Sequence, residues 1–588
     1  MNANRHDLMH RADNLCSSTY SPQRSARLLR SHRALLFRLR PVPVSVQDRI
    51  NHHHTGCVNR ICWSPDGGLA LGSVSDDCTI RVWTLDSDHQ LKRRQVIPTP
   101  HQSNIFGIRF LNCDKELARF ATGAKDGGVC VSSAGSPDAR LKFFCHNDSV
   151  MEIEQSPDRP SDVFWSASED ATVRQWDLRC PTTCRCDTGA DCTTSNILID
   201  GRGSDPINWG FSSISVSPVD SNVMLTGSDV AGRLFDRRML SLKSIGNTEI
   251  GGSKPVQQFL PSHFKHCSHK PFVTYASFSP CGRQVVVNYN GDHAYVFNVG
   301  VNSDSDNTNV TTITNRQSKK NNATEFYELG NEEMIHCRWD QAVRLYSSAL
   351  SWPDITSTLS RSLLIRRSAA LQKRGWLGDI HAAVRDAERA VLHSTEDDDS
   401  CAVKQLVNCL EDVGHDVRAA QLREQYNVAC ERLNMPQRTV CRESCNTTDY
   451  ETRLVGHANL ETGIKEATFL SSDLVGCASD DGIVWVYEAG SGVIVNTIDE
   501  GGAENMGLNC VRVHPTLGLS CVATSGLDHH IQLFSAVGAG RGTDSGTLRY
   551  DYRDHLAFNQ RAIMHGSQPQ ISLRQLFFSR NVELLDVH

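Results

Sequence analysis

The 588-residue sequence lacks the features of a membrane-spanning, secreted or nucleic-acid-binding protein. No apolar run approaches the roughly eighteen residues needed to cross a bilayer. The first residues lack the compact apolar core of a secretory signal. The net charge is −7 and the pI about 6.4, whereas phosphate binding usually requires a basic excess. We therefore expect a soluble protein that binds neither membrane nor nucleic acid directly.

The short motifs of common enzymes are also missing. There is no Walker phosphate loop, no Gly-x-Ser-x-Gly elbow and no His-Glu-x-x-His helix. The 22 cysteines are scattered through apolar positions, which without a secretory signal favours reduced thiols in the cytoplasm and nucleus. We expect no catalytic activity and no cofactor.

What the chain does contain is an internal repeat, clearest between His54 and Trp83. This unit holds a turn histidine, an apolar strand, a Ser-Pro-Asp-Gly turn, a small-residue strand, Asp77 in a turn and a final strand ending in Trp83. Alternating apolar residues and turn punctuation predict four short antiparallel strands. One such sheet leaves its faces uncovered, so several are expected to pack radially.

The unit recurs six more times, and seven units commonly close a propeller without unpaired edges. We predict an all-β seven-bladed WD40 propeller. The six further copies lie at 101–131, 146–179, 214–236, 276–297, 456–487 and 513–534.

Between the fifth and sixth copies the period changes from strand-like to helical. Small and apolar residues recur at helical spacing around Trp339 and Trp376 and let paired helices approach closely, so the insert resembles tetratricopeptide repeats. The Trp-Asp dipeptide at 339–340 is therefore expected on a helix and does not mark the end of a propeller strand. The predicted organisation is a basic N-terminal segment 1–50, blades one to five at 51–300, a flexible linker 301–322, an all-α insert 323–435, a linker 436–450, blades six and seven at 451–540 and a C-terminal tail 541–588.

A histidine near the start of each repeat and an aspartate in its later turn suggest either a catalytic pair or a structural bond. A catalytic pair occurs once, whereas this pattern recurs from repeat to repeat, and buried polar groups need partners. We predict structural pairs. They are His54 with Asp77, His146 with Asp170, and His457 with Asp481.

The third and fourth repeats end in similar boxes, Trp176-Asp177-Leu178-Arg179 and Phe235-Asp236-Arg237-Arg238. An arginine braced by a carboxylate on a propeller rim can offer a planar fork of donors to a partner. A single copy would suggest a solvated surface arginine. Two copies in neighbouring blades favour a shared docking face made by Trp176, Asp177, Arg179, Phe235, Asp236 and Arg238.

Two groups of possible metal ligands are weaker candidates. In the run 52–54, the third histidine already fills the repeat's own histidine position. Four cysteines share one loop, whereas structural zinc sites usually show separated cysteine pairs. We predict no metal site and keep zinc in this loop as the alternative. The four are Cys180, Cys184, Cys186 and Cys192.

At these residues the chain resembles the Trp-Asp-x-Arg class of WD40 proteins, which are substrate receptors of cullin-4 RING ubiquitin ligases. More closely it resembles the family of WD and tetratricopeptide repeats protein 1 (adipose). That resemblance rests on five repeats, an insert and two repeats in this order, and on segments such as 56–59, 104–106 and 559–561.

The resemblance implies docking of the damaged-DNA-binding-protein adaptor through the two boxes, and presentation of target proteins for ubiquitination. It also implies a role in regulating fat storage. The alternative is a ligase-independent scaffold or transcriptional co-repressor that binds histones or histone deacetylase. For the Arg-rich N-terminal segment, composition fits a mitochondrial transit peptide, whereas the family implies an adaptor-docking helix.

Overall fold

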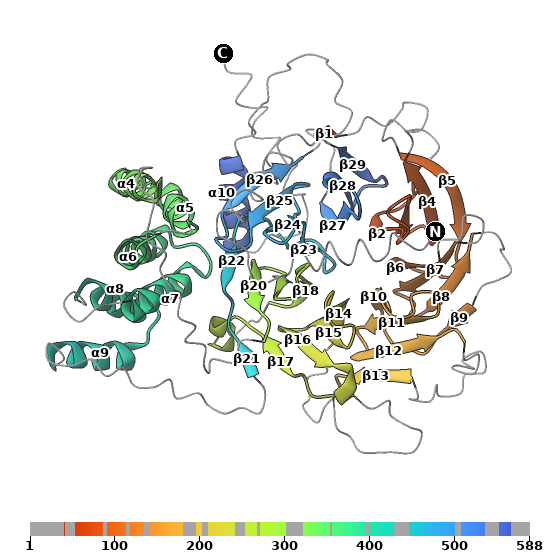
Figure 1. The fold of residues 1–588 in the computed structure, drawn as a ribbon, viewed down its shortest axis with the longest axis horizontal. Coiled ribbons are helices and arrows are strands. Elements are labelled where there is room, and N and C mark those ends of the chain that lie inside the picture. The colour runs from red at the N-terminus through yellow and green to blue at the C-terminus, as the bar shows by residue number, and fades with distance from the viewer. Residues whose placement is uncertain are drawn as a thin grey trace, which may run out of the picture.

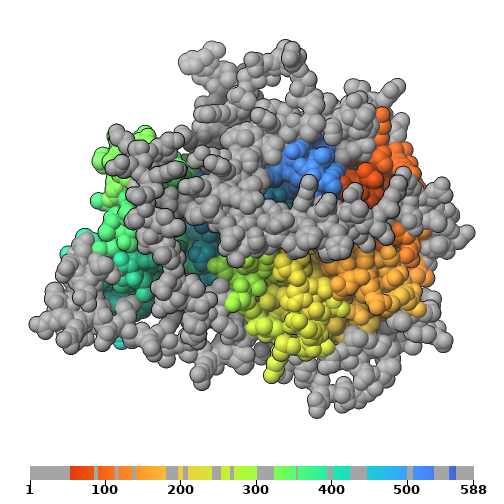
Figure 2. Space-filling view, viewed as in Figure 1, coloured from red at the N-terminus to blue at the C-terminus, as the bar shows by residue number. Residues whose placement is uncertain are grey.

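The computed structural model describes residues 40–41, 53–85, 91–112, 118–134, 141–179, 196–202, 210–240, 253–266, 271–300, 322–352, 355–393, 400–428, 446–499, 507–535 and 552–565. Over these residues the strands form seven sheets, six of four strands and one of five. Figure 1 shows the sheets arranged around a common centre, with a group of helices at one side. In the space-filling view the helices form a green lobe beside the sheets (Figure 2). The sheets are consistent with the blades predicted from the repeats.

The first three sheets each use four consecutive strands. Serine side chains brace the turn between the first two strands of a sheet, as when Ser64 Oγ accepts from the Ala70 amide at 2.9 Å. The first sheet contains β2 (Val58–Trp63), β3 (Ala70–Ser75), β4 (Thr79–Leu85) and β5 (Leu91–Pro98); the second β6 (Ile105–Asn112), β7 (Arg119–Ala124), β8 (Val129–Ser133) and β9 (Leu141–Phe143); the third β10 (Val150–Gln155), β11 (Val163–Ser168), β12 (Thr172–Asp177) and β13 (Ile197–Asp200).

The fourth and fifth sheets recruit strands from beyond the helices. The fourth contains β14 (Phe211–Val216), β15 (Val223–Ser228), β16 (Ala231–Asp236), β17 (Gln257–Phe259) and β21 (Asn446–Thr448), and the fifth β18 (Val273–Phe278), β19 (Gln284–Tyr289), β20 (Ala294–Asn298) and β22 (Thr452–Leu454).

These pairings correct two predicted boundaries. The fifth sheet is not complete within 51–300, because β20 pairs with β22 through Val296 and Thr452. Residues 446–448 of the predicted linker form a parallel edge strand on β17. An edge strand with free backbone donors and acceptors can take a further strand from a distant part of the chain.

The sixth sheet is sequential, whereas the seventh joins both ends of the strand-forming chain. In the latter, Arg40 pairs with Ser535 and Pro41 with Phe534. These two are the described residues of the N-terminal segment 1–50, and they form an edge strand instead of part of a helix. The sixth contains β23 (Ala467–Phe469), β24 (Leu474–Ala478), β25 (Val484–Glu488) and β26 (Ile494–Ile498), and the seventh β27 (Leu508–His514), β28 (Gly518–Gly526), β29 (Gln532–Ser535) and β1 (Arg40–Pro41).

The core lies between neighbouring sheets. Within the described residues, one apolar cluster fills each space between consecutive sheets, and a further cluster joins the seventh sheet to the first through Ile61, Trp83 and Cys521. The cysteines at 62, 477 and 521 are buried, and none of the described cysteines forms a disulfide. Burial of this apolar surface is the main stabilising contribution to such a fold.

Within the described residues, six helices follow β20 and pack consecutively on one another. Small residues allow the close approach, because a Cβ on Gly330 would overlap the ring of Tyr346. They are α4 (Asn322–Ile335), α5 (Trp339–Leu350), α6 (Ser357–Arg374), α7 (Asp379–Leu392), α8 (Ser400–Asp412) and α9 (Asp416–Val428).

A seventh helix, α10 (Tyr552–His565), lies in the segment predicted as a tail. Leu556 joins the apolar cluster between the fifth and sixth sheets, and Asn559 is fully buried. The prediction of a simple tail is therefore wrong for 552–565, because an amphipathic helix supplies part of this core.

Candidate partner-docking face

The His–Asp pattern forms a buried hydrogen-bonded network within individual sheets. In the third sheet, His146 Nδ1 lies 2.9 Å from Asp170 Oδ2 and its Nε2 lies 2.7 Å from Ser166 Oγ. Trp176 Nε1 donates to the same Ser166 Oγ at 2.8 Å. This network ties the loop before the sheet to its second and third strands.

The same network recurs in the first two sheets. His54 Nδ1 lies 2.8 Å from Asp77 Oδ2, and its Nε2 lies 2.8 Å from Ser73 Oγ. His101 repeats it with Asp126 at 3.2 Å and Thr122 at 2.9 Å. Repetition at equivalent positions favours the structural role over a catalytic one.

Electrostatics in these networks keep the aspartates ionised. Burial acts to raise the pKa of Asp170, but hydrogen bonds and charge from His146, with hydrogen bonds from Thr172 and the Asn147 amide, hold the pKa below its ordinary value. Burial lowers the pKa of His146. A neutral histidine donating to a carboxylate satisfies both buried groups.

The predicted pair of His457 and Asp481 is not formed. His457 Nε2 lies 3.0 Å from Asn288 Oδ1, while Asp481 Oδ2 accepts from Asn559 Nδ2 at 2.7 Å. Helix α10 supplies this amide, so the donor expected from the repeat's own histidine is replaced by one from the predicted tail.

In the two arginine boxes the aromatic residues are buried. Trp176 and Phe235 are each only 1% exposed. They belong to the apolar clusters on either side of the third sheet. Their place in the predicted docking face stays a prediction, and in this structure their rings pack between the sheets and are not accessible to a partner.

The two arginines, by contrast, project into solvent and are braced by their own boxes. Arg179 Nε lies 2.8 Å and Nη2 2.5 Å from the carboxylate of Asp177, and the Arg179 side chain is 47% exposed. Each box also closes a turn, because the arginine amide donates to the same carboxylate.

The second box has the same geometry. Arg238 Nε lies 2.9 Å and Nη2 2.6 Å from the carboxylate of Asp236, and the Arg238 side chain is 60% exposed. The hydrogen bond from Arg238 lowers the pKa of Asp236. A bidentate brace fixes the plane of each guanidinium and leaves Nη1 outside the brace.

Both boxes lie at the same end of neighbouring sheets. Each follows the third strand of its sheet, β12 or β16, and β14 contacts both β10 and β11. Arg237 of the second box reaches the third sheet, where its Cζ lies 4.8 Å from the ring centre of Trp165. The sequence-predicted pair of arginines is thus brought to one rim.

Two exposed apolar side chains on this rim were not predicted. Met239 is 75% exposed and directly follows Arg238, and Val219 is 64% exposed. Val219 belongs to the turn whose Asp220 Oδ2 accepts from Arg238 Nη2 at 3.3 Å. We call Arg179, Arg238, Val219 and Met239 the docking face. In the sequence, the position of Val219 in the turn before β15 and of Met239 directly after the second box could have indicated them.

A third box of this kind was also missed. Arg202 donates through its amide and Nε to Asp200 Oδ1 at 3.0 and 2.9 Å. Asp200 pairs with Thr172 at the beginning of β12, whereas Asp177 ends that strand. Arg202 therefore lies at the opposite rim. The Asp-Gly-Arg sequence at 200–202 could have indicated it.

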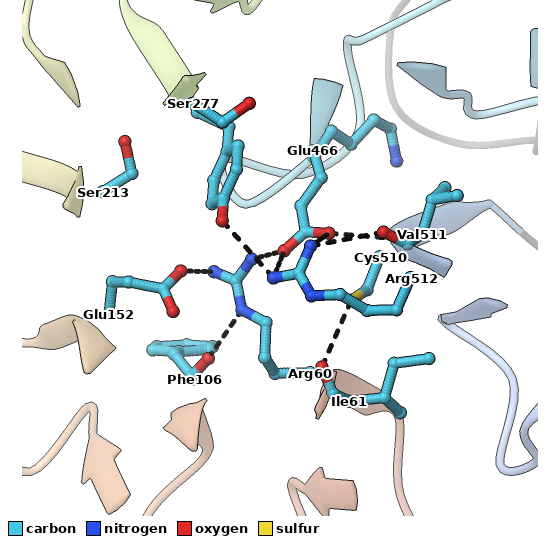
Figure 3. Close-up of polar contacts among 12 residues, drawn as sticks. Arg60, Ile61, Phe106, Glu152, Ser213, Ser277, Glu466, Cys510, Val511 and Arg512 are labelled. Atoms are coloured by element: carbon cyan, nitrogen blue, oxygen red, sulfur yellow. Dashed lines mark hydrogen bonds and ion pairs between the residues drawn. The ribbon is translucent and has the colours of Figure 1, made fainter. Parts of the chain in front are cut away.

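A cluster of charged side chains lies between strands of several sheets (Figure 3). Arg60 lies between Glu152, at 3.0 Å, and Glu466. Arg512 Nη2 donates to Glu466 Oε1 at 2.6 Å. Arg60, Glu152 and Glu466 are at most 1% exposed, so this cluster links the inner strands of several sheets and is not accessible to a protein partner.

Several predicted features lie outside the described residues. These include most of the N-terminal segment 1–50 and the four cysteines of the loop 180–192. The helices that the structure describes include none long and apolar enough to cross a bilayer. Among the side chains that the structure describes, no three or more His, Cys, Asp or Glu residues lie close enough together to hold a metal ion.

The sequence is similar to those of WD40-repeat proteins. The model of the WD domain, G-beta repeat, matches residues 45–84. Human WD and tetratricopeptide repeats protein 1 is 27% identical over 82% of this chain and 83% of its own. Protein ALTERED SEED GERMINATION 2 of Arabidopsis thaliana is 26% identical over 82% of this chain and 85% of its own. Human DDB1- and CUL4-associated factor 6 is 32% identical over 42% of this chain and 27% of its own.

Proposed function

Since this chain is a WD40-repeat relative of WD and tetratricopeptide repeats protein 1, we propose that it is a non-catalytic substrate receptor of a cullin-4 RING ubiquitin ligase. The docking face would bind the damaged-DNA-binding-protein adaptor and hold target proteins near the ligase. The receptor would then act by raising the effective concentration of its target. We also propose a role in regulating fat storage, in cytoplasm and nucleus.

The architecture behind this proposal is a closed seven-bladed ring with a tetratricopeptide-repeat insert. Pairing of β1 with β29 and contact between β2 and β27 support ring closure. The consecutive packing of α4 to α9 supports the repeat assignment. In such a ring the rim position of each third strand is set by the fold, so boxes after two neighbouring third strands face a common partner.

One observation carries the function: two carboxylate-braced arginines are exposed at the same rim of adjacent sheets, beside exposed Val219 and Met239. Interfaces are enriched in arginine and methionine at the expense of lysine and glutamate. A guanidinium held in plane loses less entropy on binding than a free side chain. Similarity over 42% of this chain to human DDB1- and CUL4-associated factor 6 supports the identity of the partner.

The test compares the double variant Arg179→Ala and Arg238→Ala with Arg202→Ala. All three arginines are braced by an aspartate two residues earlier, but Arg202 lies at the other rim. We expect the double variant to bind purified adaptor roughly tenfold or more weakly, as loss of charge-assisted hydrogen bonds produces. Arg202→Ala should bind as the wild type does.

Both variants should keep the wild-type melting temperature, because exposed ion pairs contribute little to stability. Unchanged adaptor binding by a folded double variant would rule out this function. If histone or deacetylase binding persisted in that variant, the ligase-independent scaffold would be the better description.

A further inference from the structure

A charged cleft lies between the helical insert and the sheets. It encloses about 130 Å³ and is lined by α5, α6 and α7 on one side and by β22 and the turn before β26 on the other. Six arginines and three carboxylates line it, although the whole chain carries a net charge of −7. The arginines are Arg344, Arg367, Arg374, Arg385, Arg389 and Arg453, and the carboxylates are Asp340, Asp386 and Glu451.

Two of these guanidinium groups are held in place by bidentate ion pairs with carboxylates. Arg367 Nε and Nη2 each lie 2.7 Å from the carboxylate of Asp386. Arg374 Nε and Nη2 each lie 2.8 Å from that of Asp379, and its Cζ lies 4.0 Å from the ring centre of Trp376. Arg344 is likewise paired with Asp340, at 2.6 Å, and Arg453 with Asp379. These pairs orient the wall of the cleft.

Among the described arginines of the cleft, Arg385 and Arg389 are held least closely by carboxylates. Arg385 Nη1 is buried and makes no hydrogen bond to any described residue; it lies 3.9 Å from Asp449 Oδ2, beyond hydrogen-bonding distance. Its Cζ lies 4.2 Å from the ring centre of Tyr450. Arg389 follows one turn later on α7, on the same side of the helix, and is exposed.

The opposite wall adds a further cation and a glycine-rich turn. Arg453 of β22 reaches across to the insert, where its Nη1 donates to the Leu377 carbonyl at 2.6 Å and its Nη2 pairs with the buried carboxylate of Asp379. The turn 490–492 reads Gly-Ser-Gly, and a Cβ on Gly490 would meet open space. An anion in the cleft therefore has donors available from both the insert and the ring.

A neighbouring buried histidine also feels the positive charges at this edge of the cleft. His263 lies against His381 of α7, with ring centres 4.8 Å apart. Burial, followed by the charges of His381, Arg453 and Arg385, lowers the pKa of His263 to about 3. The field at this edge of the cleft thus disfavours any additional cation and favours an anion.

We propose that this cleft binds a small anion carrying two or more phosphate groups, held by Arg385 and Arg389 and facing Arg453. Guanidinium forks match phosphate oxygens in planar, bidentate pairs. The small enclosed volume suits such a compact anion better than an extended acidic peptide. Because its walls come from both parts of the chain, the ligand would fasten the insert to the ring.

Isothermal titration calorimetry of the full chain with inorganic tripolyphosphate tests the site, with citrate at equal ionic strength as the carboxylate comparison. We expect saturable one-to-one binding of tripolyphosphate and much weaker binding of citrate. Arg389→Gln should weaken binding roughly tenfold or more. Arg389 is exposed, so this variant should fold normally.

Arg423→Gln is the matched control, because Arg423 is an exposed arginine of α9 that does not line the cleft. Its affinity should equal that of the wild type. A second variant, Arg385→Gln, should weaken binding as well and should raise the pKa of His263, which titration by nuclear magnetic resonance would detect.

Absence of tripolyphosphate binding, equal loss in the Arg423 and Arg389 variants, or equal affinity for citrate would each overturn the proposal. So would binding restricted to acidic peptides. Adaptor binding by the docking face is measured separately, so failure here leaves the proposed function unaffected.

Discussion

Neutralising Glu466 tests whether the buried charged cluster stabilises the packing of the sheets. The Glu466 side chain is fully buried and accepts hydrogen bonds from both Arg60 and Arg512. Burial acts to raise the pKa of Glu466, but the charges of Arg512 and Arg60 hold it below its ordinary value. Glu466→Gln would leave two buried guanidinium groups under-compensated.

Removing one partner of a buried ion pair typically costs about 3–5 kcal/mol. With an m value of about 3 kcal/mol/M, this loss lowers the urea midpoint by roughly 1 to 1.7 M. Far-UV circular dichroism at 215 nm follows the sheets during urea unfolding. The measurement should be made at pH 7, where Glu466 is ionised.

Glu154→Gln is the matched control for this experiment. Glu154 lies 3.0 Å from Arg109 but is 19% exposed, so its loss should cost less than that of Glu466 because solvent screens the pair. If both variants lowered the midpoint equally, or if Glu466→Gln had no effect, the assigned role of the buried cluster would be refuted.

Three further changes test other parts of the fold. Gly330→Ala should destabilise the insert by about 1–3 kcal/mol, since the new methyl group would overlap the Tyr346 ring; helical unfolding at 222 nm measures this, and an unchanged midpoint would contradict the packing. Asn559→Ala should cost about 1–3 kcal/mol by removing a donor to buried Asp481, and should expose α10 to limited proteolysis; resistance equal to wild type would argue against docking. Burial and Lys465 lower the pKa of His457 from 6.5 to about 3, so its contribution to stability is complete above pH 6.5 and is lost as the pH falls. Each pH unit below 6.5 therefore costs the wild type about 1.4 kcal/mol of stability, or about 2 kcal/mol by pH 5. His457→Asn removes this titration, so the variant should lose about 2 kcal/mol less than the wild type between pH 7 and pH 5. Urea midpoints at both pH values measure the difference, and an identical loss in both proteins would contradict the prediction.

The repeat pattern predicted most of the strands and the His–Asp networks of the first and third sheets. His146, Asp170 and Trp176 belong to one sheet, and their bonds follow from the spacing of a single repeat. The helical insert could likewise be predicted, because the spacing of apolar residues changes from a period of two in the strands to a helical period in the insert. Such features depend on local alternation, turn residues and short-range hydrogen bonds.

The partner of Asp481 illustrates what local pattern did not predict. Its donor, Asn559, lies 78 positions later in the chain, and the repeat histidine His457 instead meets Asn288 of the previous sheet. The division of the fifth sheet between β20 and β22 has the same origin. Open strand edges and buried acceptors form hydrogen bonds with the groups that tertiary packing brings close to them. The distance along the sequence does not predict which groups these are.

By itself, then, the sequence determined the strand rhythm, the interruption by helices and the presence of two Asp-x-Arg boxes. Only the tertiary structure decided that Trp176 and Phe235 are buried while Arg179 and Arg238 are exposed at a common rim. It also brought the arginines of α7 opposite β22 to form the cleft. Burial and juxtaposition depend on how separate sheets and helices pack together, which is a property of the whole chain and not of any one repeat.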